Sequence, residues 1–247
     1  MGNTALAPAR ATRGTWSGVE MMLEWKDVDP NKAGEDGPVP LLLAACDGQE
    51  VMAKLLLGWD DVDSDKPDLS DHTPLSGAAF YGHEGVVKLL LKRDDLSADK
   101  PDIHDETPLW WTAAKEHARV AESILGWDDV NPDRPNECGR TPLTMCSGHK
   151  GVVKLLLGKN GIDPENPNVR GRTLLSGAAC SGHEGVAKLL LGRDDINYDK
   201  PDKNSQGPLL WAARNGHEGA AILLLEWERS ALASQTWTAK HYSTALL

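Results

Sequence analysis

The sequence predicts an all-α solenoid, in which short helix-turn-helix units joined by hairpin connectors stack in chain order. The first observation is a period of 34 residues, marked by Thr73-Pro74-Leu75, Thr107-Pro108-Leu109 and Thr141-Pro142-Leu143. The second is a His that recurs ten residues after the start of a repeat, at His83, His117, His183 and His217. Such regular self-similarity indicates one supersecondary unit copied along the chain.

A short first helix is expected at the start of each repeat. Thr73-Pro74 suits its N-terminus, because a Thr side chain can cap an orphan amide and Pro presets the helical φ. Leu75, Ala78 and Ala79 would then share one face, small enough for a second helix to approach closely. Gly82 is expected to end this helix.

A second helix is expected from about Glu84 to Leu91, with Val87, Leu90 and Leu91 on one stripe. A pair of such short helices is marginal alone, so it must bury its flanks against neighbouring repeats. The acidic, Pro-containing connector at 94–102 favours an extended hairpin over a helix.

The net charge excludes some classes of partner. With 37 acidic residues against 26 basic ones, the chain carries a formal charge of -11. This charge disfavours binding to nucleic acid or to an anionic membrane surface. A basic or neutral partner is easier to accommodate.

The four cysteines, at positions 46, 138, 146 and 180, show no CxxC spacing. They are therefore expected to be reduced thiols, which favours a cytoplasmic or nuclear protein. Neither a secretory signal nor an apolar run long enough to span a bilayer is found in the sequence.

The residues from Thr73 to His83, followed by Gly85 to Leu91, carry a recognisable signature: Thr-Pro-Leu, paired Ala, Gly-His and a Val-Val-x-Leu-Leu-Leu run. This pattern resembles the ankyrin repeat over about residues 39–226. The resemblance implies an ankyrin-repeat solenoid that binds another protein. The Trp-Asp-Asp-Val and Asp-Lys-Pro-Asp connectors look like those of fungal arrays.

The period sets the expected domain organisation. Residues 1–38 are expected to hold an N-terminal segment with a truncated capping repeat, whose helix lies near 16–25. Five repeats follow, at 39–72, 73–106, 107–140, 141–172 and 173–206. A sixth repeat begins at 207–226, and residues 227–247 form a C-terminal cap or tail that could pack through Trp237, His241 and Tyr242.

The repeat at 141–172 is shortened by two residues between Thr141 and His149. Either its first helix is a distorted single turn or the stack bends there, and the shortening is a tolerated defect or a functional hinge. A second departure concerns the His that the family usually has directly after Thr-Pro-Leu. Ser76, Trp110 and Thr144 stand there instead, which puts the polar link between helices in doubt.

Candidate chemistry is sparse. His83-Glu84 begins like an HExxH zinc site, but Val87 stands where the second His is required. Each recurring His is instead expected to form a hydrogen bond with the backbone at the turn between helices. Asp61 to Asp65 begins like a calcium loop but lacks the required Gly and Glu. We therefore expect no metal, no cofactor and no enzymatic activity. An enzyme with a site in the 141–172 irregularity, using Cys146 or His149, is a minor alternative.

The tryptophans fall into two sets. Trp25, Trp59, Trp127 and Trp227 follow second helices and are expected to be partly exposed covers over the connectors. Trp111 and Trp211 are expected at the outward position of first helices, where they could contact a partner.

In ankyrin-like proteins, partners usually dock on the hairpin tips and on the concave face that the first helices expose. Carried over by position, this resemblance assigns partner contacts to Leu69, His72, Phe80, Tyr81, Ile103, His104, Trp111, Lys115, Arg140, Arg170, Arg172, Trp211 and Arg214. The row varies between repeats, as expected of positions freed from packing. Its C-terminal half is basic, so an acidic segment of a partner could lie there.

The expected function is a monomeric protein-interaction scaffold with an unidentified protein partner. The alternative is a sensor or autoinhibitory region acting on an attached or associated signalling ATPase, as similar fungal arrays often do.

Overall fold

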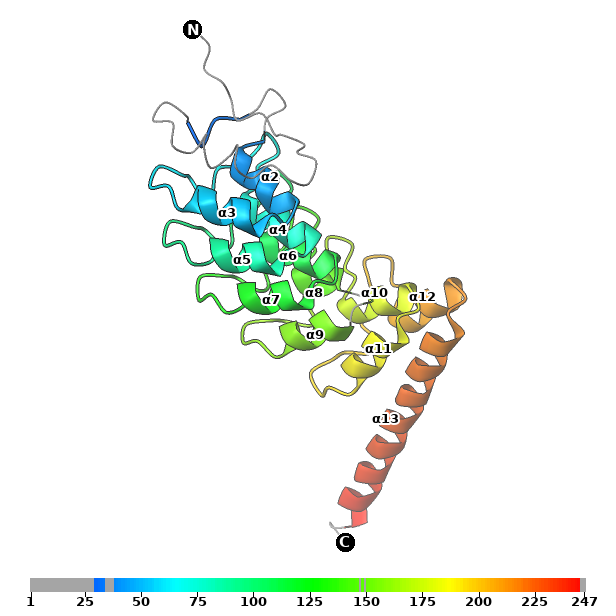
Figure 1. Cartoon of the computed structure of the whole chain (residues 1–247). Helices are drawn as coiled ribbons and strands as arrows, with labels where there is room; N and C mark the ends of the chain where they lie inside the picture. The colour runs from blue at the N-terminus through cyan, green and yellow to red at the C-terminus, as the bar shows by residue number, and fades with distance from the viewer. Residues whose placement is uncertain (1–28, 34–37, 147, 149, 245–247) are drawn as a thin grey trace. The chain divides into compact units, whose positions relative to one another are not determined.

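The computed structural model describes residues 29–33, 38–146, 148 and 150–244, with side chains as far as Ala231. The chain divides into two compact units, residues 1–137 and 138–247. Twelve helices, and no strand, occur among the described residues (Figure 1). The predicted all-α class is confirmed.

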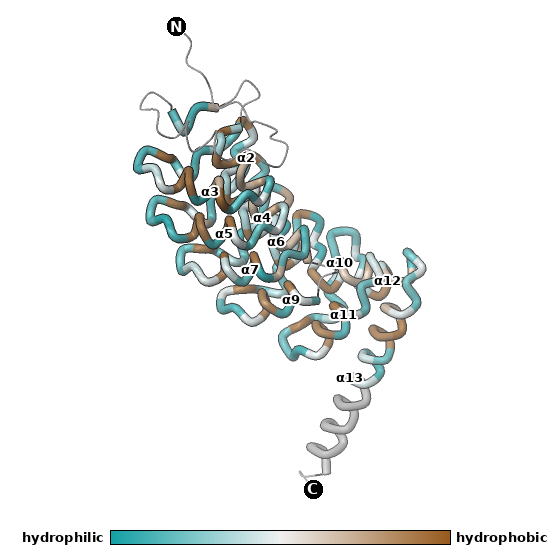
Figure 2. Tube along the Cα trace, in the orientation of Figure 1, coloured by the Kyte–Doolittle hydropathy of each residue, from teal (hydrophilic) through white to brown (hydrophobic). Residues whose placement is uncertain are grey.

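Three helix pairs make up the described part of the N-terminal unit. They are α2 (Pro40–Cys46) with α3 (Glu50–Leu57), α4 (Pro74–Tyr81) with α5 (Glu84–Leu90), and α6 (Pro108–Ala114) with α7 (Ala118–Ile124). The first helices α2, α4 and α6 contact one another in chain order, and so do the second helices α3, α5 and α7. Figure 2 shows the hydrophobic stretches within the helices and hydrophilic ones in many of the connectors.

The C-terminal unit also stacks its helix pairs in chain order. They are α8 (Pro142–Met145) with α9 (Lys150–Leu157), α10 (Leu174–Cys180) with α11 (Glu184–Leu191), and α12 (Pro208–Arg214) with α13 (Glu218–Thr244). Helix α13 is continuous past residue 226. The packing expected of Trp237, His241 and Tyr242 lies outside the described side chains, and the helix expected at 16–25 lies outside the described residues.

The first helix of a repeat forms as predicted. The Thr73 hydroxyl accepts a hydrogen bond from Ser76 N at 3.2 Å, and Ser76 Oγ accepts one from Thr73 N at 2.9 Å. This capping box satisfies two amides at the start of α4. Leu75 and the paired alanines are fully buried, and α4 ends at Gly82, whose φ of 78° is left-handed.

The second helix differs from the prediction by about one residue. Val86, Val87 and Leu90 are fully buried, whereas α5 ends at Leu90 and Leu91 is half-buried. Truncating a buried leucine such as Leu90 costs about 2–5 kcal/mol, because the removed atoms leave a cavity.

In two repeats the recurring His contacts the repeat before it. Nε2 of His83 lies 2.9 Å from the Cys46 carbonyl oxygen, and Nε2 of His117 lies 3.1 Å from that of Phe80. The prediction of a bond to backbone is confirmed for these two residues, although the carbonyl belongs to the preceding repeat. This bond supplies a polar link between repeats that the missing family His had put in doubt.

The shortened repeat contains a single-turn first helix, as one of the two alternatives predicted. Helix α8 has four residues, and Thr141 still caps it by accepting from Thr144 N at 3.3 Å. Cys146 is fully buried after this turn, and its Sγ donates to the Pro142 carbonyl at 3.1 Å. A small thiol therefore fills core space where the Ala pair is missing.

The connectors are tight turns with no strand among the described residues. At one tip Asp68 N donates to His72 O at 3.0 Å, and at the next Asp102 N donates to Glu106 O at 3.1 Å. Successive tips are joined by single backbone bonds, such as Ile103 N to Ser70 O at 3.3 Å. Each of these connectors thus forms the turn of the predicted hairpin but not its extended strands.

Candidate functional site

The tips owe their shape to an Asp or Asn at their first position. Asp68 Oδ1 accepts from the amides of Ser70 and His72 at 2.8 and 2.9 Å. The same pair of bonds recurs at Asp102, Asn168 and Asp202. These residues are not among the predicted site residues, although Asp or Asn at 68, 102, 136, 168 and 202 is a sequence signal for Asx turns.

We call the tips and first helices of a unit its tip face. In the N-terminal unit it comprises residues 68–72, 102–106 and 136–137 with α2, α4 and α6. In the C-terminal unit it comprises residues 138–140, 168–172 and 202–206 with α8, α10 and α12. The first eight predicted contact residues lie on or directly beside the N-terminal tip face, and the last five lie on the C-terminal one.

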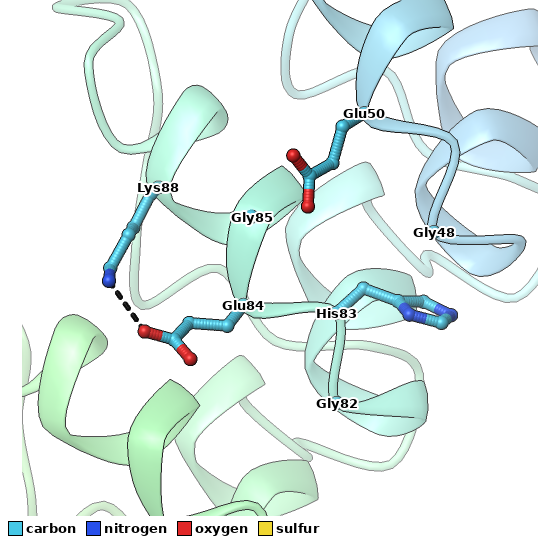
Figure 3. Close-up of a pocket in the computed structure, with 7 residues that line it drawn as sticks. All are labelled: Gly48, Glu50, Gly82, His83, Glu84, Gly85 and Lys88. Carbon is cyan, nitrogen blue, oxygen red and sulfur yellow. Dashed lines mark hydrogen bonds and ion pairs between the residues drawn. The ribbon is translucent and has the colours of Figure 1, made fainter.

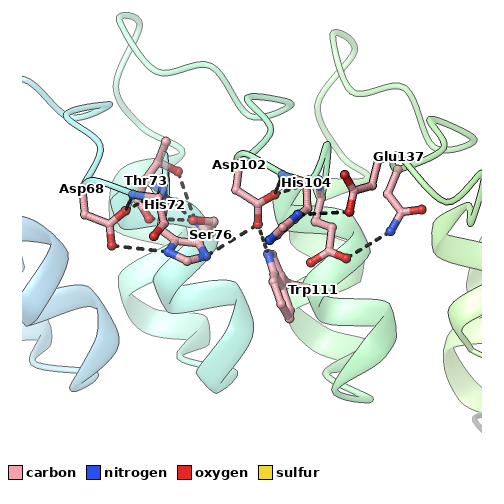
Figure 4. A network of polar contacts seen from close by, with 11 residues as sticks. Asp68, His72, Thr73, Ser76, Asp102, His104, Trp111 and Glu137 are labelled. Carbon is pink, nitrogen blue, oxygen red and sulfur yellow. Dashed lines mark hydrogen bonds and ion pairs between the residues drawn. The ribbon is translucent and has the colours of Figure 1, made fainter.

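A polar network runs along the N-terminal tip face (Figure 4). Asp102, a buried residue, accepts from Trp111 Nε1 at 3.2 Å and lies 3.6 Å from His72 Nε2. The other ring nitrogen of His72 lies 3.3 Å from Asp68. Further along, His104 Nδ1 lies 3.1 Å from Glu137 Oε1. These contacts tie a tip to its helix and to the neighbouring tip.

An aromatic cluster lies beside this network. The ring centroid of Phe80 is 4.8 Å from that of Tyr81 and 4.9 Å from that of Trp111, both in tilted or edge-on geometry. Lys115 Nζ lies 4.3 Å from the Phe80 centroid, a cation–π distance. Phe80 and Trp111 are half-buried, whereas Tyr81 is 55% exposed. The rings hold one another in place while leaving an apolar surface open.

Two tips add exposed aliphatic side chains. Leu69 is 89% exposed and Ile103 is 56% exposed, each at the second position of its tip. Neither position requires an apolar residue for packing. Together with Tyr81, they give the N-terminal tip face three exposed large hydrophobic side chains.

On the C-terminal tip face, the expectation for Trp211 is wrong. Trp211 was expected to point outward, but it is only 8% exposed, because the guanidinium of Arg172 lies 3.6 Å from its ring centroid. Its Nε1 donates to Asp202 Oδ2 at 3.2 Å, and Arg172 Nε lies 3.5 Å from the same oxygen. Trp211 and Arg172 are therefore partners of each other. Arg140, Arg170 and Arg214 remain exposed on this face.

The Asp202 carboxyl is held in its charged form. Burial raises its pKa, but bonds from the amides of Gln206 and Asn204, from Trp211 and from Arg172 lower it below the ordinary value. Asp102 makes the corresponding bonds in the N-terminal unit, with His72 in the place of Arg172.

A pocket of about 430 Å³ opens between the second helices α3 and α5 (Figure 3). It is lined by Gly48, Glu50, Gly82, His83, Glu84, Gly85 and Lys88. Its glycines have structural roles: a Cβ at Gly85 would overlap the Glu50 carboxylate, and one at Gly48 would overlap the His83 ring. Glu84 is ion-paired with Lys88. These residues serve packing between repeats.

The carboxylates of the stretch that begins like a calcium loop also have structural roles. Asp63 Oδ1 accepts from Asp65 N at 3.0 Å, and Asp65 Oδ2 accepts from Ser97 N at 2.7 Å, so these carboxylates hold connectors. No group of three or more His, Cys, Asp or Glu in the described part of the chain could hold a metal ion. Trp59, Trp127 and Trp227 are half-exposed as predicted, and Trp25 lies outside the described residues.

The cysteines differ in accessibility. Burial raises the pKa of the Cys46 thiol to about 11 and raises that of Cys146 further. Cys138 is exposed and Cys180 is half-buried. None of the four cysteines forms a disulfide in the structure.

Among the described residues, no helix is both long and apolar enough to cross a bilayer. No curated protein matches the sequence. A family model described as ankyrin repeats (3 copies) matches residues 9–102 and 148–235, well over half of the chain. Helix pairs that stack in order, tips joined by backbone bonds and this match agree: the chain belongs to the ankyrin repeat family, whose repeats are generally protein–protein interaction modules.

Proposed function

We propose that the chain is a protein-interaction scaffold whose partner lies across the tip face of the N-terminal unit. The observation that carries this proposal is the exposure of Leu69, Tyr81 and Ile103 beside the half-buried rings of Phe80 and Trp111. Exposed apolar residues cost solubility unless a partner covers them.

The apolar exposure is concentrated on one side of the N-terminal unit. Three of the four large hydrophobic residues exposed in its described part lie on the tip face, and Val51 on α3 is the fourth. Val51 thus offers a matched comparison, because it is 59% exposed and lies on a second helix.

The aromatic cluster has the properties of an interface anchor. Phe80 packs between Tyr81 and Trp111, and Trp111 is further fixed by its bond to Asp102. Side chains already held in position lose little conformational entropy on binding. Aromatic residues are also enriched among the residues that dominate interface energies.

The experiment begins with affinity capture of partners by the full chain and their identification by mass spectrometry. The affinity of each identified partner is then measured with Tyr81→Ala and Ile103→Ser variants. An anchor residue contributes about 2 kcal/mol or more, so the double variant is expected to bind at least about thirtyfold more weakly.

Val51→Ser is the control, because it removes an equally exposed aliphatic residue from the second-helix side. It is expected to leave the affinity unchanged. A partner bound equally well by all variants would reject the tip face as its site. Identification of the partner as a nucleotide-hydrolysing signalling protein would turn the scaffold proposal into the sensor or autoinhibitory alternative.

A further inference from the structure

The tip faces of the two units carry opposite charge. The N-terminal tip face contains six Asp and Glu residues and no Lys or Arg. The C-terminal tip face contains five Lys and Arg residues and one acidic residue, Asp202. The same geometric surface, built from the same repeat, therefore favours different ligands in the two units.

The single carboxylate of the C-terminal tip face is already satisfied. Asp202 accepts bonds from the amides of Asn204 and Gln206 at 2.8 and 3.0 Å and from Trp211 at 3.2 Å, and Arg172 lies against it. One of the five cations, Arg172, is thus neutralised inside the unit. The positive charge that remains is carried by exposed side chains.

Those cations follow the order of the tips. Arg170 and Lys203 occupy successive tips that are joined by the bond from Lys203 N to Arg170 O at 3.0 Å. Both side chains are exposed, and so is Arg214 at the end of α12, whose guanidinium lies 5.6 Å from the Trp211 ring centroid. The preceding tip, joined by the bond from Val169 N to Cys138 O, carries the exposed Arg140. Each tip therefore presents one cation.

The spacing of these cations suits an extended chain. Backbone segments joined by hydrogen bonds lie about 4.7–4.9 Å apart, and the bond from Lys203 N to Arg170 O gives these two tips about that separation. The long side chains of Arg170 and Lys203 can spread further apart than their backbones. An extended peptide advances about 3.3–3.6 Å per residue and places every second side chain on the same face, so side chains on one face are about 7 Å apart. Carboxylates at every second residue would therefore meet successive cations.

Resting on the proposed scaffold function, we infer that the C-terminal tip face binds an extended acidic segment of a partner protein, with carboxylates on Arg140, Arg170 and Lys203. The exposed Val169 lies beside Arg170 and offers an apolar contact to the intervening residues. A polyphosphate would leave this apolar side chain uncovered.

The test uses the full chain and a fluorescent peptide of four Asp-Ser pairs, with binding followed by anisotropy at low and at physiological ionic strength. A peptide of the same composition with its aspartates clustered tests the spacing, and a peptide of four Lys-Ser pairs tests the sign. We expect the spaced acidic peptide to bind best and salt to weaken it, since exposed charges are screened.

The decisive variant is Arg170→Glu with Lys203→Glu. An exposed ion pair contributes little by itself, but charge reversal at two positions replaces two attractions by two repulsions, so a loss of about 10- to 30-fold is expected. Lys154→Glu with Lys188→Glu is the matched control, because it makes the same charge change at exposed positions of α9 and α11. This control is expected to change binding by less than about twofold.

Equal weakening by the two double variants would overturn the inference, because it would indicate a general effect of net charge. Failure of the acidic peptide to bind would also overturn it. So would a finding that binding to single-stranded RNA or to anionic vesicles, or self-association of the chain, depends on Arg170 and Lys203 more strongly than peptide binding does. The Tyr81→Ala and Ile103→Ser variants should still bind the peptide. If a captured partner depends on Tyr81 while the peptide does not bind, this inference alone fails and the scaffold proposal stands.

Discussion

Replacing Gly182 with Ala tests how each recurring His packs on the repeat before it. Gly182 has φ of +73°, and a Cβ there would lie 2.6 Å from Nδ1 of His217. Gly216 also has φ of +73°, but a Cβ there would meet nothing within 4 Å. Both glycines lie in the C-terminal unit. The pair therefore separates the cost of the left-handed backbone from the cost of displacing His217.

The magnitudes follow from these distances. An L-residue in the left-handed region costs about 1–2 kcal/mol, partly offset because Ala restricts the unfolded chain more than Gly does. Gly216→Ala is thus expected to lower the free energy of unfolding by about 1 kcal/mol. Gly182→Ala adds the cost of forcing the His217 ring off its site, about 1–3 kcal/mol for overpacking. Its total cost is expected at about 2–4 kcal/mol.

The assay is urea unfolding followed by circular dichroism and tryptophan fluorescence, extended to a double-mutant cycle with His217→Ala. Removing the ring should abolish the clash, so Gly182→Ala in the His217→Ala background should cost no more than Gly216→Ala. The coupling free energy is expected at about 1–3 kcal/mol. Equal destabilisation by the two glycine substitutions, or a coupling of zero, would refute the packing of His217 on Gly182.

Three further outcomes are expected. Glu116 holds the matching position with φ of 68°, so Glu116→Gly should raise the free energy of unfolding by up to about 1 kcal/mol in the same urea assay. Because the folded-state pKa of Asp202 is lowered, its ionised form stabilises the fold above the unfolded-state pKa and loses this effect as pH falls through the folded value. Wild type should therefore lose more stability than Asp202→Asn between about pH 5 and pH 2, measured by urea unfolding at each pH. Iodoacetamide at pH 8 should modify Cys138 first, with Cys46 and Cys146 reacting only after unfolding, as peptide mass mapping would reveal.

The sequence alone determined the elements and their order, because these depend on short-range chemistry. Thr73-Pro74 began a helix and Gly82 ended it as predicted, since a cap, a preset φ and a left-handed glycine act within a few residues. The short apolar stripes required neighbours, which fixed the solenoid. The shortening after Thr141 likewise predicted a single-turn helix as one of two alternatives, and α8 has four residues.

The choice of side chains that face solvent, and of those that face one another across repeats, depends on tertiary packing. Trp111 and Trp211 occupy equivalent positions, yet Arg172 covers the second while the shorter His72 leaves the first half-exposed. The Cys46 carbonyl oxygen that Nε2 of His83 contacts lies 37 residues earlier in the chain. Such contacts depend on the stacking of one repeat upon the next, which brings together residues that no local pattern relates.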